Sequence, residues 1–193
     1  MVEVNSTMVP LGTEAPTFTL PDAHGRSWSL DEIATGRRGL VVVFLSNHCP
    51  FVRHIARALG EVASTYDARG IAFVGINAND VAAYPDDAPE RMVEFAAANG
   101  WAFPYLFDES QEVAKAYRAA CTPDFFLFDA DRRLVYRGQF DSTRPSRPDP
   151  ATGADLRRAM DALLAGEPPR EDQIPSIGCN IKWRPGNEPD YFA

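Results

Sequence analysis

The stretch from Gly39 to Pro50, GLVVVFLSNHCP, decides the fold. Its first part, GLVVVFL, is a continuous apolar run rich in β-branched residues, which predicts a strand buried on both faces. From Phe51 onwards apolar residues recur at every third or fourth position, which predicts a helix over 50–68. Pro50 suits the first turn of that helix. A buried strand that passes directly into a helix indicates an α/β sheet.

The rest of the chain continues this alternation of strands and helices. The pattern predicts a hairpin before residue 30, strands at 71–77, 105–107, 125–128 and 134–139, and helices at 89–99, 111–119 and 155–165. Crossover helices between buried strands make those strands parallel, and the closing hairpin adds an antiparallel edge. We therefore expect an α/β sandwich with a mixed sheet.

Composition restricts the classes of partner. The chain has 193 residues, 45% hydrophobic and 24% charged, as is usual for an ordinary globular domain. Its net charge of −8 argues against a nucleic-acid or anionic-membrane partner, because both are negatively charged. The longest apolar run is far shorter than a membrane span, and we expect no signal peptide. With free thiols, this predicts a cytoplasmic location.

The last 27 residues differ from the body. The segment 167–193 is rich in proline and has no clear period, yet it contains Ile177, Trp183 and Tyr191. A disordered tail would be poorer in such residues. We expect a domain over 1–166 and an extended, proline-rich tail over 167–193 that packs on it.

Cys49 is the candidate nucleophile. It lies between the buried strand and the helix, where free N–H groups and the helix dipole favour a thiolate. His48, Arg53 and His54 add positive charge nearby. The alternative is a buried, inert cysteine. The carboxyl edge of an α/β sheet is a common ligand site, which favours the reactive interpretation.

Three motifs carry a family resemblance. Gly12–Leu20 (GTEAPTFTL) resembles the opening of the redoxins, and Ser46–Pro50 (SNHCP) resembles the peroxiredoxin active-site turn. Cys121–Asp129 (CTPDFFLFD) resembles the cis-proline segment of thioredoxin-like disulfide reductases. The chain thus resembles the peroxiredoxin-like AhpC/TSA group with a single active-site cysteine. The resemblance implies a thioredoxin-like three-layer sandwich with a mixed central sheet, an N-terminal β-hairpin and an extended C-terminal tail.

The chain departs from that family at the reactive loop. Cys49-Pro50-Phe51-Val52 lacks the second cysteine of a thioredoxin motif. Pro123 also occupies the neighbourhood of the usual peroxiredoxin arginine. Arg53 and Arg137 are the candidates to replace that arginine.

The resemblance also implies roles for the residues around Cys49. Ser46 would bond the peroxide or the thiolate, or else satisfy the backbone of the turn. His48 would tune the thiol or donate a proton, or else be an exposed loop residue. Pro50, Thr122 and Pro123 would bind substrate. Pro123 is expected to be cis, with Thr122 offering its backbone to an extended peptide.

A second thiol is needed to resolve an oxidised Cys49. Cys121, two residues before Pro123, is expected to lie near Cys49, and Cys179 on the tail is its rival. An external thiol is the third choice. The sequence leaves all of these open.

The expected function is that of a thiol oxidoreductase with Cys49 as nucleophile toward disulfide or hydroperoxide substrates. The alternatives are a dedicated thiol peroxidase and a non-catalytic module that binds peptides or a metal. We expect no organic cofactor, because no phosphate-binding glycine loop is present, and no resident metal. The expected partners are a protein or small-molecule disulfide, or a hydroperoxide, with an external thiol reductant. A homodimer stays open.

Overall fold

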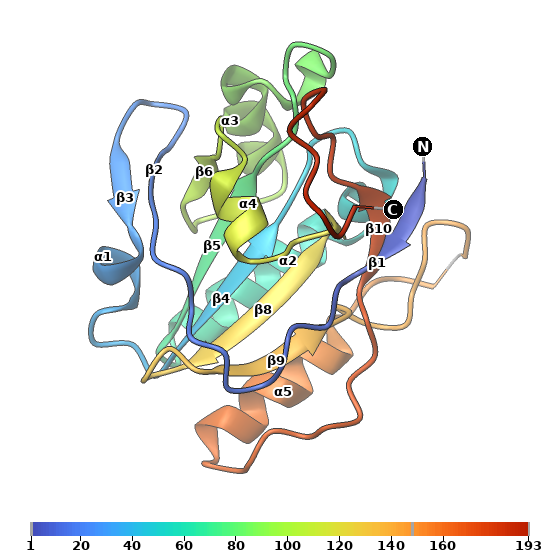
Figure 1. Ribbon diagram of the computed structural model, residues 1–193. Helices are drawn as coiled ribbons and strands as arrows, with labels where there is room; N and C mark the ends of the chain where they lie inside the picture. The colour runs from blue at the N-terminus through green and yellow to red at the C-terminus, as the bar shows by residue number, and fades with distance from the viewer. Residues whose placement is uncertain (1, 148, 193) are drawn as a thin grey trace.

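The central sheet of the computed structural model has the strand order β6-β5-β4-β8-β9 (Figure 1). The structure describes residues 2–147 and 149–192. β4 (Gly39–Phe44) and β5 (Ile71–Asn77) are buried along their whole length, as their apolar runs predict. They pair in parallel with each other, and β5 pairs in parallel with β6 (Tyr105–Phe107).

The direction of β8 (Asp124–Asp129) differs from the sequence prediction. β8 pairs with β4 antiparallel, and β9 (Leu134–Gly138) then pairs antiparallel with β8. The helix before it, α4 (Glu112–Ala116), has 5 residues and spans only about 7 Å. It is too short to return the chain to the opposite end of the sheet, so β8 starts where β6 ended and runs back.

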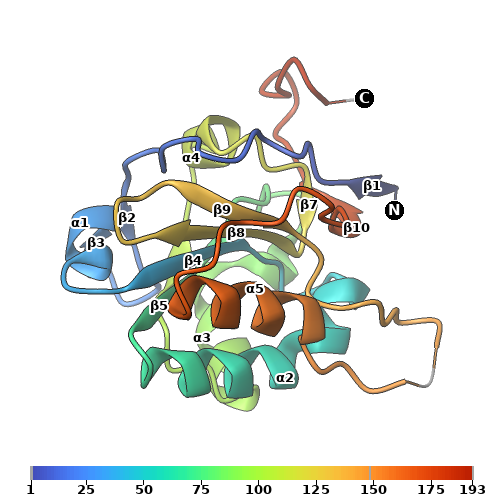
Figure 2. The same ribbon diagram turned by 90° about the horizontal axis from the view of Figure 1, so that it is seen from below.

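One face of the sheet is covered by α2 (Pro50–Asp67) and α5 (Ala154–Leu164), with α3 (Pro89–Ala98) beside them (Figure 2). Apolar side chains at helical spacing on α2, among them Val52, Ile55 and Leu59, pack against this face. Burial of these side chains stabilises the helices, since isolated helices of this length are marginal.

The other face is covered by the N-terminal segment and α4 (Figure 2). β2 (Thr19–Pro21) and β3 (Ser27–Ser29) form the expected hairpin, and α1 (Leu30–Ala34) follows it. The side chain of Ser29 caps α1 by accepting from the backbone of Glu32.

The tail adds a strand that the sequence did not predict. β10 (Ile177–Asn180) lies between β1 (Glu3–Asn5) and β7 (Cys121–Thr122), and pairs antiparallel with both. Beyond it, Ile181 and Trp183 are buried in the core. The tail therefore packs on the body through a strand as well as through its apolar side chains.

Two further features complete the fold. A short 3-10 helix, η1 (Pro85–Asp87), follows β5. In the part of the chain that the structure describes, none of the helices has the length and apolar character needed to cross a bilayer.

Gly60 on α2 supports a first prediction, about stability. A Cβ added at Gly60 would lie 2.6 Å from the carbonyl oxygen of Asn99 and 3.1 Å from that of Gly100. Helix propensity alone would make Gly60→Ala stabilising by up to about 1 kcal/mol, but overpacking against backbone costs about 1–3 kcal/mol. We expect a lower free energy of unfolding in urea titrations. Exposed Ser64→Ala on the same helix is the control and should not destabilise; a stabilised Gly60→Ala would contradict the prediction.

Candidate active site

Cys49 lies at the N-terminus of α2, after the turn 45–48 that follows β4. It is the N-cap residue, and Pro50 occupies the first turn, as expected. The side chain is 0% exposed. Because the first turn of a helix has unsatisfied N–H groups and a partial positive charge, this position stabilises a negative sulfur atom.

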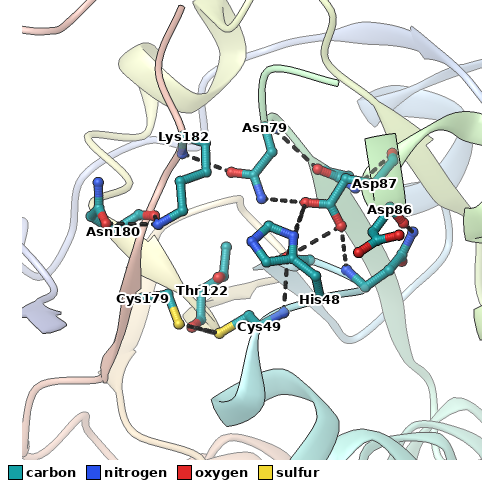
Figure 3. Close-up of polar contacts among 12 residues, drawn as sticks. His48, Cys49, Asn79, Asp86, Asp87, Thr122, Cys179, Asn180 and Lys182 are labelled. Atoms are coloured by element: carbon teal, nitrogen blue, oxygen red, sulfur yellow. Dashed lines mark hydrogen bonds and ion pairs between the residues drawn. The ribbon is translucent and has the colours of Figure 1, made fainter. Parts of the chain in front are cut away.

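Cys179 is the thiol that the structure brings to Cys49. The two Sγ atoms are 2.9 Å apart, in hydrogen-bonding contact and longer than the ~2.05 Å of a disulfide bond (Figure 3). The pairing of β10 with β7 sets this contact, because it places Cys179 opposite Thr122. The Cys49 Sγ is in turn 3.1 Å from the carbonyl oxygen of Thr122.

Gly178 permits this close approach of β10 to the proline loop. The Thr122–Pro123 peptide bond is cis, as the resemblance implied. A Cβ at Gly178 would lie 2.1 Å from the carbonyl oxygen of Thr122 and 3.2 Å from the nitrogen of Pro123. A residue with any side chain would therefore push the strand, and Cys179 with it, away from Cys49.

The two thiols have opposite acidities. Burial acts to raise the pKa of Cys49, but hydrogen bonds from the side chains of Cys179 and Thr122, and from the backbone of Val52 and Cys179, outweigh it and lower this pKa to about 6. The same contact raises the pKa of Cys179, together with burial and the charge of Cys49. The first proton therefore leaves Cys49, and Cys179 stays protonated as its donor.

A buried carboxylate, Asp87, organises the turn before Cys49. It is 0% exposed and lies at the end of η1. It accepts hydrogen bonds from the backbone of Asn47 at 2.6 Å and from the side chains of Ser46 at 3.0 Å, His48 at 2.8 Å and Asn79 at 2.6 Å. Burial acts to raise the pKa of Asp87, but these donors hold it below its ordinary value.

His48 binds Asp87 through its ring and precedes Cys49 in the chain. Its ring is stacked on Tyr84, with centroids 5.3 Å apart. The hydrogen bond to Asp87 is the main cause of a raised His48 pKa, and the charge of Cys49 adds to it, while burial opposes both. His48 is therefore a partly buried, protonatable group rather than an exposed loop residue.

The other residues predicted from the sequence lie in different surroundings. The Ser46 hydroxyl donates to Asp87 and accepts from the backbone N–H of Cys49 at 3.3 Å. Of the two roles expected for Ser46, these contacts correspond to satisfying the backbone of the turn.

The two candidate arginines lie on α2 and on β9. Arg53 is an exposed residue of α2. Arg137 donates to the Val9 carbonyl and the Gln173 side chain at 2.7 Å. None of these contacts reaches the Cys49 sulfur, and catalytic roles for these residues stay predictions.

Cys121 is buried, and the hydrogen bond of its sulfur goes to Pro123 rather than to Cys49. Its Sγ is 3.5 Å from the carbonyl oxygen of Pro123, and burial raises the pKa of Cys121 well above its ordinary value. In the strand register it lies opposite Asn180, one residue beyond Cys179. The resolving partner that the geometry favours is thus Cys179.

The expectation that Thr122 offers its backbone to a peptide needs correction. That backbone is paired with Cys179 of the same chain, so the tail occupies the edge where an extended substrate would add. The sequence could not show this, because nothing in β10 indicates its partner.

Asp87 was missed, although a signal for its surroundings existed. Asn77 is the last residue of β5 and Asn79 follows that strand, whose carboxyl end lies beside that of β4 and hence near Cys49. Polar residues at such a position indicate a site. Within the described residues, no group of three or more His, Cys, Asp and Glu side chains is arranged to hold a metal ion.

Comparison with known proteins relates most of this chain to a family. The model of the AhpC/TSA family matches residues 11–137. A Mycobacterium tuberculosis protein named as a candidate peroxiredoxin is 32% identical over 114 residues, which cover 59% of this chain and 67% of that protein. A crystal structure of a hypothetical protein from Sinorhizobium meliloti is 52% identical with a TM-score of 0.91, covering 94% of this chain and 99% of that one.

A more distant structure identifies the fold. A thioredoxin-family thiol:disulfide interchange protein from Chlorobium tepidum has a TM-score of 0.61 at 20% identity, covering 81% of this chain and 99% of that one. At this identity the likeness concerns the fold alone. It confirms the thioredoxin-like α/β fold with a mixed sheet.

The acidity of Cys49 gives the second prediction. Because its pKa is lowered to about 6, the thiolate is present above that pH and is lost as the pH falls through it. Titration of thiolate absorbance should therefore show a midpoint near pH 6, and Cys179→Ala should move it upward by removing the donor. Cys121→Ala is the matched control and should leave it in place. A midpoint near that of an ordinary thiol in the unmodified chain would refute the prediction.

Gly178 gives the third prediction. Gly178→Ala should displace β10 from Thr122 and separate the two sulfur atoms. Disulfide formation with a thiol oxidant should slow on the order of tenfold to a hundredfold, since small misplacements of reacting groups are that costly. Labelling of Cys49 by a bulky maleimide should become faster. Ile174→Ala, an exposed change on the same tail, should alter neither rate.

Proposed function

The chain belongs to the AhpC/TSA family, and from that premise we propose that it reduces hydroperoxides with Cys49 as nucleophile and Cys179 as resolving thiol. At the broader level it is a thiol oxidoreductase of the thioredoxin superfamily. The observation that carries the proposal is the 2.9 Å contact between the two Sγ atoms. That contact supplies both the acidity of the nucleophile and the second thiol that the reactive loop lacks.

The first step is attack of the Cys49 thiolate on the terminal oxygen of a hydroperoxide. The O–O bond breaks, its electron pair leaves with the departing oxygen, and that oxygen takes up a proton to become an alcohol or water. Sulfur is oxidised to a sulfenic acid as the peroxide is reduced. A pKa of about 6 keeps Cys49 ionised at neutral pH.

The second step is attack of Cys179 on that sulfenic acid. A disulfide forms, and the sulfenic hydroxyl leaves as water with the proton of Cys179. The contact and charge of the Cys49 thiolate raise the pKa of Cys179, whereas Lys182 lowers it. Once Cys49 is a neutral sulfenic acid, its negative charge no longer opposes ionisation of Cys179. Oxidation of the first thiol therefore activates the second.

The occupied edge at Thr122 favours a small substrate over a protein disulfide. An extended peptide would have to displace β10, which is paired on both sides. Cys49 and Cys179 are 0% and 1% exposed. A hydroperoxide needs far less displacement than a peptide to reach this site. The resulting disulfide is returned to two thiols by an external thiol reductant.

Mapping of the oxidised cysteines is the fourth prediction and the test of this function. Reduced protein is mixed with an equimolar amount of hydrogen peroxide, quenched with a thiol alkylator at millisecond intervals, and mapped by mass. We expect Cys49 to oxidise much faster than a free thiol and a Cys49–Cys179 disulfide to follow. Cys179→Ser should stop at the sulfenic acid or its further oxidation products, and Cys121→Ala should behave as the unmodified chain.

Three results would count against it. Oxidation of Cys49 no faster than a free thiol would exclude a peroxidase. A disulfide to Cys121 would assign the resolving step to the other thiol. Redox turnover that survives Cys49→Ser would exclude Cys49 as the nucleophile.

A further inference from the structure

We propose that His48 is the catalytic acid that protonates the leaving oxygen of the hydroperoxide, and that Asp87 is the residue that positions it. The inference deepens the proposed function and rests on it. It identifies the source of the proton in the first step, and it decides between the roles that the sequence left open for His48.

Asp87 accepts several hydrogen bonds, which hold its carboxylate in one orientation. Its side chain is fully buried, and its oxygens receive the hydrogen bonds of Ser46, Asn47, His48 and Asn79. These groups come from the turn after β4 and from the segment after β5. A carboxylate held from several directions keeps one orientation, so it fixes the ring that it binds.

The hydrogen bond to Asp87 determines which His48 nitrogen can react. An ionised carboxylate only accepts hydrogen bonds, so the Nδ1 atom, 2.8 Å from the Asp87 oxygen, carries a hydrogen. In the charged ring the Nε2 atom carries the other hydrogen. Figure 3 shows the ring between Asp87 and the side of the site where Cys49, Asn180 and Lys182 lie. Stacking on Tyr84 holds the plane of the ring.

The surrounding charges favour the protonated ring on balance and raise the pKa of His48. Asp87 on η1 and Cys49 at the start of α2 favour the imidazolium, and Lys182 on the tail opposes it. Lys182 is itself engaged with Asn180, whose backbone and side-chain oxygens accept from its Nζ at 3.0 and 2.8 Å. The site therefore combines a thiol of lowered pKa, Cys49, with an imidazole of raised pKa at the preceding position in the chain.

The arginines considered from the sequence are placed less favourably. Arg53 is exposed on α2, and the guanidinium of Arg137 is bound to Val9 and Gln173. His48 is adjacent to the nucleophile in the chain and interacts with its charge.

A proton from His48 completes the reduction of the hydroperoxide in the first step. The Cys49 thiolate forms the S–O bond, the O–O bond breaks, and the departing alkoxide or hydroxide takes the Nε2 proton. The products are a sulfenic acid, an alcohol or water, and a neutral His48. General acid catalysis of this kind contributes about 10²–10⁴ in rate.

The fifth prediction uses two oxidants that differ in their need for a proton. Hydrogen peroxide releases hydroxide, a poor leaving group, whereas peroxyacetic acid releases acetate, which is stable as an anion. At neutral pH, His48→Gln should slow oxidation of Cys49 by hydrogen peroxide on the order of 10²-fold. The loss with peroxyacetic acid should be much smaller. Any change in thiolate population affects both oxidants equally and cancels in their ratio.

Asp87→Asn tests the positioning role. The ratio of the hydrogen peroxide rate to the peroxyacetic acid rate, each calculated per un-ionised oxidant, should fall with rising pH as His48 loses its proton. Without the carboxylate that raises the His48 pKa, this fall should occur at lower pH. A residue that only supports the fold would not shift the profile. If Asp87→Asn does not fold, the ratio of the two oxidation rates in His48→Gln tests the assignment of the acid without it.

Matched controls separate the alternatives. His54→Gln changes a histidine on α2 whose ring binds Thr143 at 2.8 Å, and it should leave the ratio unchanged. Equal losses with both oxidants in His48→Gln, or a selective loss in Lys182→Met instead, would overturn the assignment of His48. An unmodified chain that reacts no faster than a free thiol would overturn the proposed function as well.

Discussion

The pairing of β10 with β7 is the interaction on which the site depends. It places Cys179 opposite Thr122 and brings its sulfur to 2.9 Å from Cys49. The opposite acidities of the two thiols depend on that contact, which lowers the pKa of Cys49 and raises that of Cys179. In the proposed function, a strand contributed by the tail supplies the second thiol that the reactive loop of a thioredoxin motif carries itself. Gly178 is the residue that makes the approach sterically possible.

The second organising element is the buried carboxylate of Asp87. Burying a charge is unfavourable unless hydrogen bonds compensate it, and here donors from two neighbouring strand ends do so. The result is a rigid turn before Cys49 and an oriented His48. Rigid placement of reactive groups is what makes positioned acids and nucleophiles effective. The proposed chemistry thus rests on two contacts, one to the sulfur of Cys49 and one to the ring before it.

The local parts of this structure could be predicted from sequence, and the non-local parts could not. The run before Cys49 and the helical spacing after it determine β4 and α2, because both patterns are contained in neighbouring residues. β10 has four residues and its partner β7 has two, and they lie more than fifty positions apart. No local periodicity describes such a pair. Likewise Asp86 and Asp87 are adjacent acids in the sequence, which gives no sign of which one is buried. The fold buries Asp87 and brings it into contact with His48.

The distance along the chain between the paired cysteines has a consequence for stability. Cys49 and Cys179 are 130 residues apart, so a disulfide between them would enclose most of the chain in one covalent loop. By the loop-entropy model, such closure stabilises the folded state by about 5 kcal/mol relative to the reduced chain. By thermodynamic linkage, the folded chain then holds that disulfide more tightly than the unfolded chain does. The melting temperature of the protein would therefore depend on its oxidation state, and the oxidised form would melt at the higher temperature.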